Sequence, residues 1–173
     1  MRDARELSSP GIPTDAEVDL ARDALLDRGT YEDEVRGVSA ELVADLRAAL
    51  EGELGTIEWQ HDPTELSRTG CAAAQTAVGG VFSESSRSLG MRSLDDGEGD
   101  KALEIVERVA HDRGFTDRST IVSGDRSQSV HDFRSADGGR VTLVVGERVG
   151  VRVNTGCRLT SERMAELRAE ERG

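Results

Sequence analysis

Each of the three histidines in the chain is followed directly by an aspartate, giving the pairs His61–Asp62, His111–Asp112 and His131–Asp132. Imidazole nitrogens and carboxylate oxygens are ligands that zinc and related divalent metals use in enzymes. His61, His111 and His131 are therefore candidate ligands of a metal ion. A metal-dependent enzyme that uses these pairs is one functional hypothesis for the chain.

Two observations favour a simpler role for the histidines. Neighbouring residues of a strand point to opposite faces, so His131 and Asp132 cannot hold one ion together if they lie in a strand. His111 falls near the C-terminal end of a predicted helix, where a charged imidazole interacts favourably with the helix dipole. We therefore interpret the three histidines as surface or capping residues, and we expect neither a metal nor another cofactor.

Cys71 and Cys157 are the only cysteines, and neither belongs to a CxxC pair of the kind that binds zinc or exchanges disulfides. A catalytic thiolate needs an activating base or helix N-terminus, and no local motif supplies one. Two other interpretations stay open on the residues alone. The cysteines are either two buried thiols or one long-range disulfide, which would stabilise the fold by about 4–5 kcal/mol in the chain-entropy estimate.

Other polar segments match known ligand loops only in part. Residues 95–100 are rich in carboxylates, but they lack the full ligand pattern and the closing glutamate of an EF-hand. Gly79 and Gly80 have no GxGxxG or Walker pattern around them, and the serines of residues 83–88 lie outside any GxSxG motif. The sequence therefore favours solvated loops over a calcium site, a nucleotide site or a catalytic serine.

Composition excludes some classes of partner. The 173 residues carry a formal net charge of −12, and 36% of them are hydrophobic. An acidic protein repels nucleic-acid phosphates and anionic membrane surfaces, so we expect no nucleic-acid partner. No apolar run approaches the 18 residues of a transmembrane helix, and the first residues are charged, so we expect no export signal within this sequence.

Four arginines near the C-terminus are candidates for a basic surface on this acidic protein, namely Arg134, Arg140, Arg148 and Arg152. Such a surface would suit an anionic partner. A solvated sheet face is the alternative interpretation. The scarce aromatic residues Tyr31, Trp59 and Phe133 occupy periodic positions, and we interpret them as core rather than as a ligand pocket.

Hydrophobic periodicity predicts four helices, over residues 14–29, 30–50, 100–113 and 160–173. The first begins with a capping box formed by Thr14 and Glu17. The second carries a long apolar stripe that must be buried against another layer, most simply a sheet. The last is charged and has only Met164 and Leu167 as apolar anchors.

Alternating patterns predict strands over residues 56–61, 120–122, 129–135, 141–145 and 149–153. The last three form a meander, because residues 137–139 supply a tight hairpin turn. Residues 64–82 are ambiguous between strand and helix, and a further strand is expected near residues 88–94. Because helices and hairpins are grouped along the chain, we predict an α+β fold with helices packed on one face of an antiparallel sheet.

We expect three regions along the chain. Residues 1–13 are polar and contain Pro10 and Pro13, as is typical of a flexible leader or tether. Residues 14–160 form a single α+β domain. Residues 161–173 form a short charged helix or tail.

Five segments carry a resemblance to a known family, namely Arg28-Gly29-Thr30-Tyr31-Glu32, Ile57-Glu58-Trp59-Gln60-His61-Asp62-Pro63, Cys71, Glu107-Arg108-Val109-Ala110-His111-Asp112-Arg113-Gly114-Phe115 and Val153-Asn154-Thr155-Gly156-Cys157. In their order and spacing the chain resembles the LppA-like lipoprotein family of actinobacteria over residues 14–160. Members of this family are exported and held to the membrane by a lipid on an N-terminal cysteine. The resemblance supplies no catalytic motif.

The resemblance implies an extracytoplasmic, lipid-anchored protein whose only membrane contact is an N-terminal anchor that this sequence does not contain. It also implies that Cys71 and Cys157 form a disulfide. We expect a non-catalytic domain that binds an unknown envelope protein or a small ligand, on the sheet face that helices leave uncovered. The alternatives are a metal-dependent enzyme and a cytosolic structural domain with free thiols.

Overall fold

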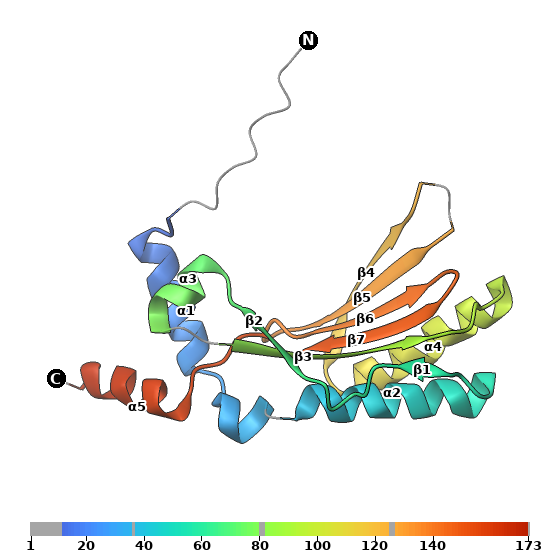
Figure 1. The fold of residues 1–173 in the computed structure, drawn as a ribbon. Helices are drawn as coiled ribbons and strands as arrows, with labels where there is room; N and C mark the ends of the chain where they lie inside the picture. Colours follow the sequence, from blue (N-terminus) through green and yellow to red (C-terminus); the bar gives the residue numbers. More distant parts are fainter. Residues whose placement is uncertain (1–11, 36, 80–81, 125–126, 173) are drawn as a thin grey trace, which may run out of the picture.

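A computed structural model describes residues 12–35, 37–79, 82–124 and 127–172. Most of the predicted leader therefore lies outside the described residues. Along the chain the elements are α1 (Asp15–Leu26), a π-helical turn η1 (Tyr31–Val35), α2 (Val38–Leu54), β1 (Trp59–Gln60), β2 (Ser67–Gly70), α3 (Ala73–Gly79), β3 (Phe82–Gly90), α4 (Asp96–Asp112), β4 (Phe115–Val122), β5 (Ser129–Ser135), β6 (Arg140–Val145), β7 (Val149–Asn154) and α5 (Ser161–Glu170) (Figure 1).

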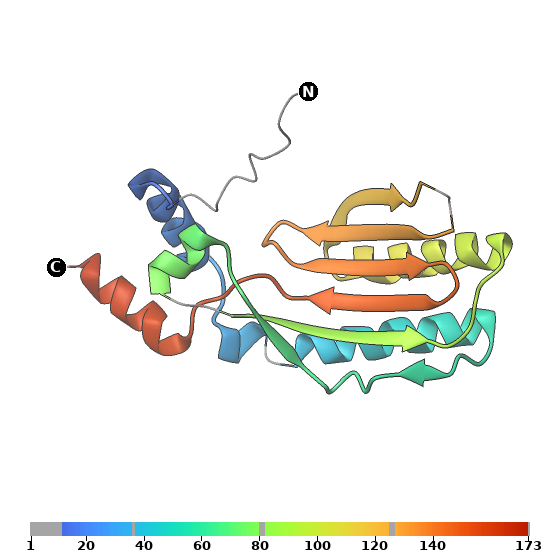
Figure 2. The ribbon, with the colours of Figure 1, turned by 45° about the horizontal axis from the view of Figure 1, so that its top comes forward.

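The strands form one antiparallel sheet in the order β1-β3-β7-β6-β5-β4, with β2 also paired to β3. Helices α2 and α4 contact each other and lie along one face of this sheet. No described helix covers the central strands on the other face, which is turned toward the viewer in Figure 2. The predicted α+β class, with helices packed on one face of an antiparallel sheet, is confirmed.

The main hydrophobic core lies between these two helices and the sheet. Its largest members are almost fully buried, and they are Leu42, Leu46, Leu50, Ile105, Val106, Phe133, Val141, Leu143, Val151 and Val153. The strand members alternate along the chain, because successive strand residues point to opposite faces. The intervening residues of the meander therefore point to the uncovered face.

Helices α1, α3 and α5 form a second hydrophobic cluster at one end of the sheet, away from the main core (Figure 1). Leu25, Val78 and Leu159 are buried there, together with the two predicted anchors, Met164 and Leu167. The sequence did not predict this cluster, because the alanine-rich run that forms α3 has no periodicity that distinguishes helix from strand.

The prediction of one helix over residues 30–50 is wrong at its start. The chain forms the turn η1 first, and α2 begins only after Gly37, whose φ of 86° lies in the left-handed region that favours glycine. No side chain of its own caps α2. Glu84 of β3 does so instead, since its carboxylate accepts hydrogen bonds from Gly37 N at 3.0 Å and from Ser39 Oγ at 2.7 Å.

The prediction of an acidic loop over residues 95–100 is also wrong. Asp95 caps α4, and Asp95 and Glu98 form a reciprocal capping box, so the carboxylates occupy the first turn of a helix rather than a calcium loop. Two glycines in this turn lower its helix propensity and led to the late predicted start. Gly99 is buried against Val145, where an added Cβ would lie 3.1 Å from a methyl carbon.

The predicted strands differ mainly in length. The strand expected over residues 56–61 shortens to β1, and the positive φ of 68° at His61 turns the chain directly after this strand. The strand expected over residues 120–122 extends back to Phe115 in β4. The strand expected near residues 88–94 is the end of β3, which stops at Gly90.

The contacts of Glu84 predict that this side chain contributes to the stability of the fold. Its side chain is fully buried and also accepts a hydrogen bond from the Tyr31 hydroxyl at 2.9 Å, so three donors converge on one carboxylate. Glu84→Gln replaces one acceptor oxygen with a donor. The free energy of unfolding measured in urea should fall by about 1–3 kcal/mol.

A matched control is Glu58→Gln, which changes the charge equally at an exposed position. This control should stay within about 0.5 kcal/mol of the parent. Equal effects of the two substitutions would contradict the capping role of Glu84.

Candidate functional site

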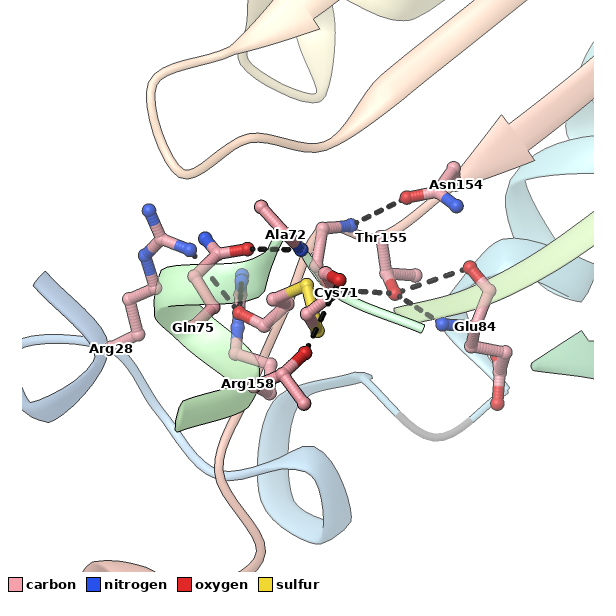
Figure 3. Close-up of a disulfide and its surroundings, with 11 residues drawn as sticks. Arg28, Cys71, Ala72, Gln75, Glu84, Asn154, Thr155 and Arg158 are labelled. Carbon is pink, nitrogen blue, oxygen red and sulfur yellow. Dashed lines mark hydrogen bonds between the residues drawn. A yellow bond between two sulfur atoms is a disulfide. The ribbon is translucent and has the colours of Figure 1, made fainter. Parts of the chain in front are cut away.

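Cys71 and Cys157 form a disulfide bond, with their Cα atoms 5.9 Å apart (Figure 3). Cys71 directly follows β2, and Cys157 follows β7. The bridge that the resemblance implied is therefore present in the structure. Since neither cysteine is free, the alternative of a domain with free thiols is wrong.

Two arginines surround the bridge. Arg28 Nη1 and Arg158 Nη1 both donate to the carbonyl oxygen of Cys157, at 3.2 and 3.0 Å. Arg158 is only 5% exposed, and it forms an ion pair with Asp137 of the β5–β6 turn. Burial, together with the nearby charge of Arg158, lowers the pKa of Arg28. The bridge, the chain after β7 and this turn are thus held together.

Asp137 stays ionised in this environment. Burial on its own would raise the pKa of the Asp137 carboxyl. A hydrogen bond from Ser135 and the positive charge of Arg158 outweigh burial, and they hold this pKa below its usual value. Asp137 is therefore committed to its structural partners.

A hollow of about 410 Å³ lies beside the bridge on the uncovered face, and both bridge cysteines line it. Its other lining residues include Gln75 of α3, Thr142 of β6 and Arg152 of β7. A smaller hollow of about 190 Å³ shares Thr142 and Arg152 and extends to Arg87 of β3. We call the two hollows together the groove. The larger hollow falls within the usual size range of small-ligand sites.

Three arginines lie along the groove. Arg87 and Arg152 are directly opposite each other on β3 and β7, and Arg140 lines the larger hollow. All three are exposed. Arg140 lies 3.6 Å from the carboxylate of Asp132, whereas Arg87 and Arg152 form no ion pair with any residue that the structure describes. The groove therefore concentrates positive charge on a protein of net charge −12.

The sequence predicted part of this set. Of the four arginines proposed as a basic face, Arg140 and Arg152 meet at the groove. Arg134 is exposed on the same face, opposite Arg140, and Arg148 lies in the turn between β6 and β7. Arg87 was missed, because β3 lacks an alternation of apolar and polar residues.

Serines take the place of apolar residues on the inner side of β3. Ser86 and Ser88 are opposite the core residues Val153 and Val151, and both are almost fully buried. Ser86 Oγ donates to the carbonyl oxygen of Pro63 at 2.6 Å, which satisfies the buried hydroxyl. A strand built in this way gives no hydrophobic signal, although a period of two in its serines was present.

The three histidines lie on different elements. His61 follows β1, His111 is in the last turn of α4, and His131 is on β5. His131 is only 7% exposed, so the interpretation of the histidines as surface or capping residues is wrong for this one. Its ring nitrogens form hydrogen bonds with the hydroxyls of Thr120 at 3.0 Å and Ser129 at 2.9 Å. Burial, followed by the charge of Arg118, lowers the pKa of His131. Within the described residues no group of three histidine, cysteine, aspartate or glutamate side chains is placed to hold a metal ion.

Comparison with known proteins now identifies the family. Residues 8–161 match the model of the LppA family, described as "Lipoprotein confined to pathogenic Mycobacterium". The chain belongs to the LppA family. No curated protein matches it. None of the described helices of this LppA-family domain is long and apolar enough to cross a membrane.

Solved structures that resemble this chain include two bacterial proteins. LppA from Mycobacterium tuberculosis has 11% sequence identity to the chain and a TM-score of 0.58, with 86% of this chain and 89% of that one covered. A DUF4853 family protein from Actinomyces odontolyticus ATCC 17982 has 13% identity and a TM-score of 0.49, with 78% and 72% covered. At such low identity the first of these supports the shared fold and nothing finer.

The disulfide makes the second prediction. Reducing the bridge, or replacing both cysteines by alanine, should lower the free energy of unfolding by about 4–5 kcal/mol, because the unfolded chain regains the freedom of a long loop. Urea unfolding with and without reductant measures this difference. Intact mass should rise by two hydrogens on reduction after denaturation, and an unchanged mass would contradict the bridge.

The third prediction concerns how the groove arginines affect the free energy of unfolding. Like charges directly opposite on neighbouring strands destabilise a sheet. Arg152→Gln should therefore raise the free energy of unfolding by roughly 0.2–1 kcal/mol. Arg158→Gln is the contrasting variant and should lower this free energy, because Arg158 is buried and paired with Asp137. Thermal unfolding of both variants at low salt tests this, and a similar loss in both would contradict it.

Proposed function

We propose that this chain is a non-catalytic, extracytoplasmic lipoprotein domain that binds a partner or small ligand of the cell envelope in the groove. The observation that carries the proposal is the groove itself, a hollow on the one face of the sheet that helices leave uncovered. Membership of a lipoprotein family and a disulfide, which persists in oxidising compartments, support the location.

The chemistry of the groove supports binding rather than catalysis. Its side chains are mainly guanidinium, amide and hydroxyl groups, which recognise polar ligands by hydrogen bonds. Asp137 is the carboxylate in the lining of the larger hollow, and its ion pair with Arg158 and its hydrogen bond from Ser135 occupy it. General acid–base catalysis needs a group that is available to exchange a proton with the substrate.

The position of α1 supports presentation from a membrane anchor. Helix α1 packs with α3, which lies at the disulfide end of the domain (Figure 1). A lipid anchor ahead of α1 would leave from this end. The larger hollow would then lie near the membrane-proximal end of the domain, within reach of envelope components.

Site-specific photo-crosslinking tests the proposal. A photoreactive amino acid replaces Val144, which lines the smaller hollow, and in a control variant it replaces Glu104, which is exposed on α4. Each variant is irradiated with an envelope fraction from a bacterium that carries an LppA-family gene. We expect an adduct at position 144 that an excess of unmodified domain suppresses, and no such adduct at position 104.

Two results would contradict the proposed function. One is equal labelling of the two positions, because contact would then be independent of the groove. The other is an adduct that an excess of unmodified domain does not reduce, since binding to a real site is saturable.

A further inference from the structure

We propose that the groove binds the phosphate group of a small, hydroxyl-rich ligand, such as a sugar phosphate, between Arg87 and Arg152. This inference rests on the proposed binding function and specifies its ligand. The two arginines hold the phosphate, and the larger hollow beside the disulfide holds the rest of the ligand.

The first support for a bound phosphate is the repulsion between Arg87 and Arg152, for which the fold offers no compensating partner among the described residues. Arg87 and Arg152 are opposite each other in the β3–β7 pair, so two like charges occupy neighbouring positions on one face. Both side chains are exposed, and among the described residues no carboxylate forms an ion pair with either. An anion placed between them would convert this repulsion into attraction.

Spacing favours a dianion with several oxygens. Directly opposed residues of an antiparallel pair have Cβ atoms about 4.5–5.5 Å apart, so two long arginine side chains can reach one small group. Guanidinium groups bind phosphate and carboxylate through paired N–H donors. A phosphate monoester brings about two negative charges and three terminal oxygens, which match two arginines, whereas one carboxylate neutralises only one of them.

Acidic groups near the groove do not block this site. Asp132 accepts a hydrogen bond from the Thr142 hydroxyl at 2.6 Å and lies 3.6 Å from Arg140 Nη1. Asp137 is paired with Arg158. Both carboxylates are therefore engaged by the protein, and Arg87 and Arg152 keep their charge available for a ligand.

The larger hollow suits a polar body of modest size. Its volume of about 410 Å³ lies at the lower end of the range for small-ligand sites, and no aromatic residue appears among its described lining residues. Gln75 Oε1 accepts a hydrogen bond from Ala72 N at 3.2 Å, which leaves its amide group to donate to a ligand. These features favour a hydroxyl-bearing body over an aromatic base or an acyl chain.

Isothermal titration calorimetry on the disulfide-bonded domain, in a phosphate-free buffer of about 0.15 M ionic strength, tests the inference. The probes are glucose 1-phosphate, inorganic phosphate, glucose, citrate and phosphatidylglycerol vesicles. We expect glucose 1-phosphate to bind more tightly than each of the others. Arg87→Gln and Arg152→Gln should each weaken its binding about tenfold or more, because each removes a charge-assisted contact.

Arg134→Gln is the matched control, because it removes the same charge from the same sheet face at a residue outside the groove lining. Its affinity should stay within about twofold of the parent, since exposed charges at a distance are screened. An equal loss in all three variants would overturn the site and indicate only general attraction to a basic face.

The remaining outcomes are equally decisive. Binding of vesicles or citrate in preference to glucose 1-phosphate would overturn the assigned ligand class, and equal affinity for inorganic phosphate would overturn the role of the larger hollow. No binding of glucose 1-phosphate, combined with a saturable adduct at position 144, would overturn the phosphate assignment while the proposed binding function stands. Absence of both would remove the two proposals together.

Discussion

The bond between Cys71 and Cys157 is the constraint that ties the smaller hydrophobic cluster, which contains both cysteines, to the ends of β2 and β7. The larger cluster lies between the sheet and helices α2 and α4, and the smaller one joins three short helices at the end of the sheet. Short helices with few apolar residues gain little stability on their own. The bridge restricts the chain where β2 and β7 end, so the three short helices pack against chain segments whose positions are fixed relative to each other.

Buried hydrogen bonds connect the chain next to the disulfide with strand β3 of the sheet. Thr155 donates its backbone N–H to the carbonyl oxygen of Glu84 at 3.0 Å, and its hydroxyl accepts from Glu84 N at 3.1 Å. The Glu84 carboxylate in turn caps α2. A single path of covalent and hydrogen bonds thus runs from the disulfide through β3 to the main helix layer. One face of the sheet is fixed in this way, and the other is left free for the groove.

Patterns among neighbouring residues predicted those elements whose formation depends mainly on residues close in sequence. The capping box of Thr14 and Glu17, the strand over residues 129–135 and the anchors Met164 and Leu167 follow from short-range patterns, and the structure contains them all. The same patterns did not predict features that depend on contacts between segments far apart in the sequence. The start of α2 depends on a carboxylate more than forty residues away, and Arg87 lies on a strand whose inner face is serine. Neither dependence leaves a periodic pattern of hydrophobic residues in the sequence.

Both half-cystines line the larger hollow, so the proposed binding site would have a redox couple in its wall. Any molecule that prefers the hollow in its bridged shape must, by thermodynamic linkage, make the bridge harder to reduce by the same factor. Reductants and occupants of the hollow would thus compete, although they act on different atoms. Reduction of the bridge and binding in the hollow would then be coupled equilibria, so that a change in one shifts the other.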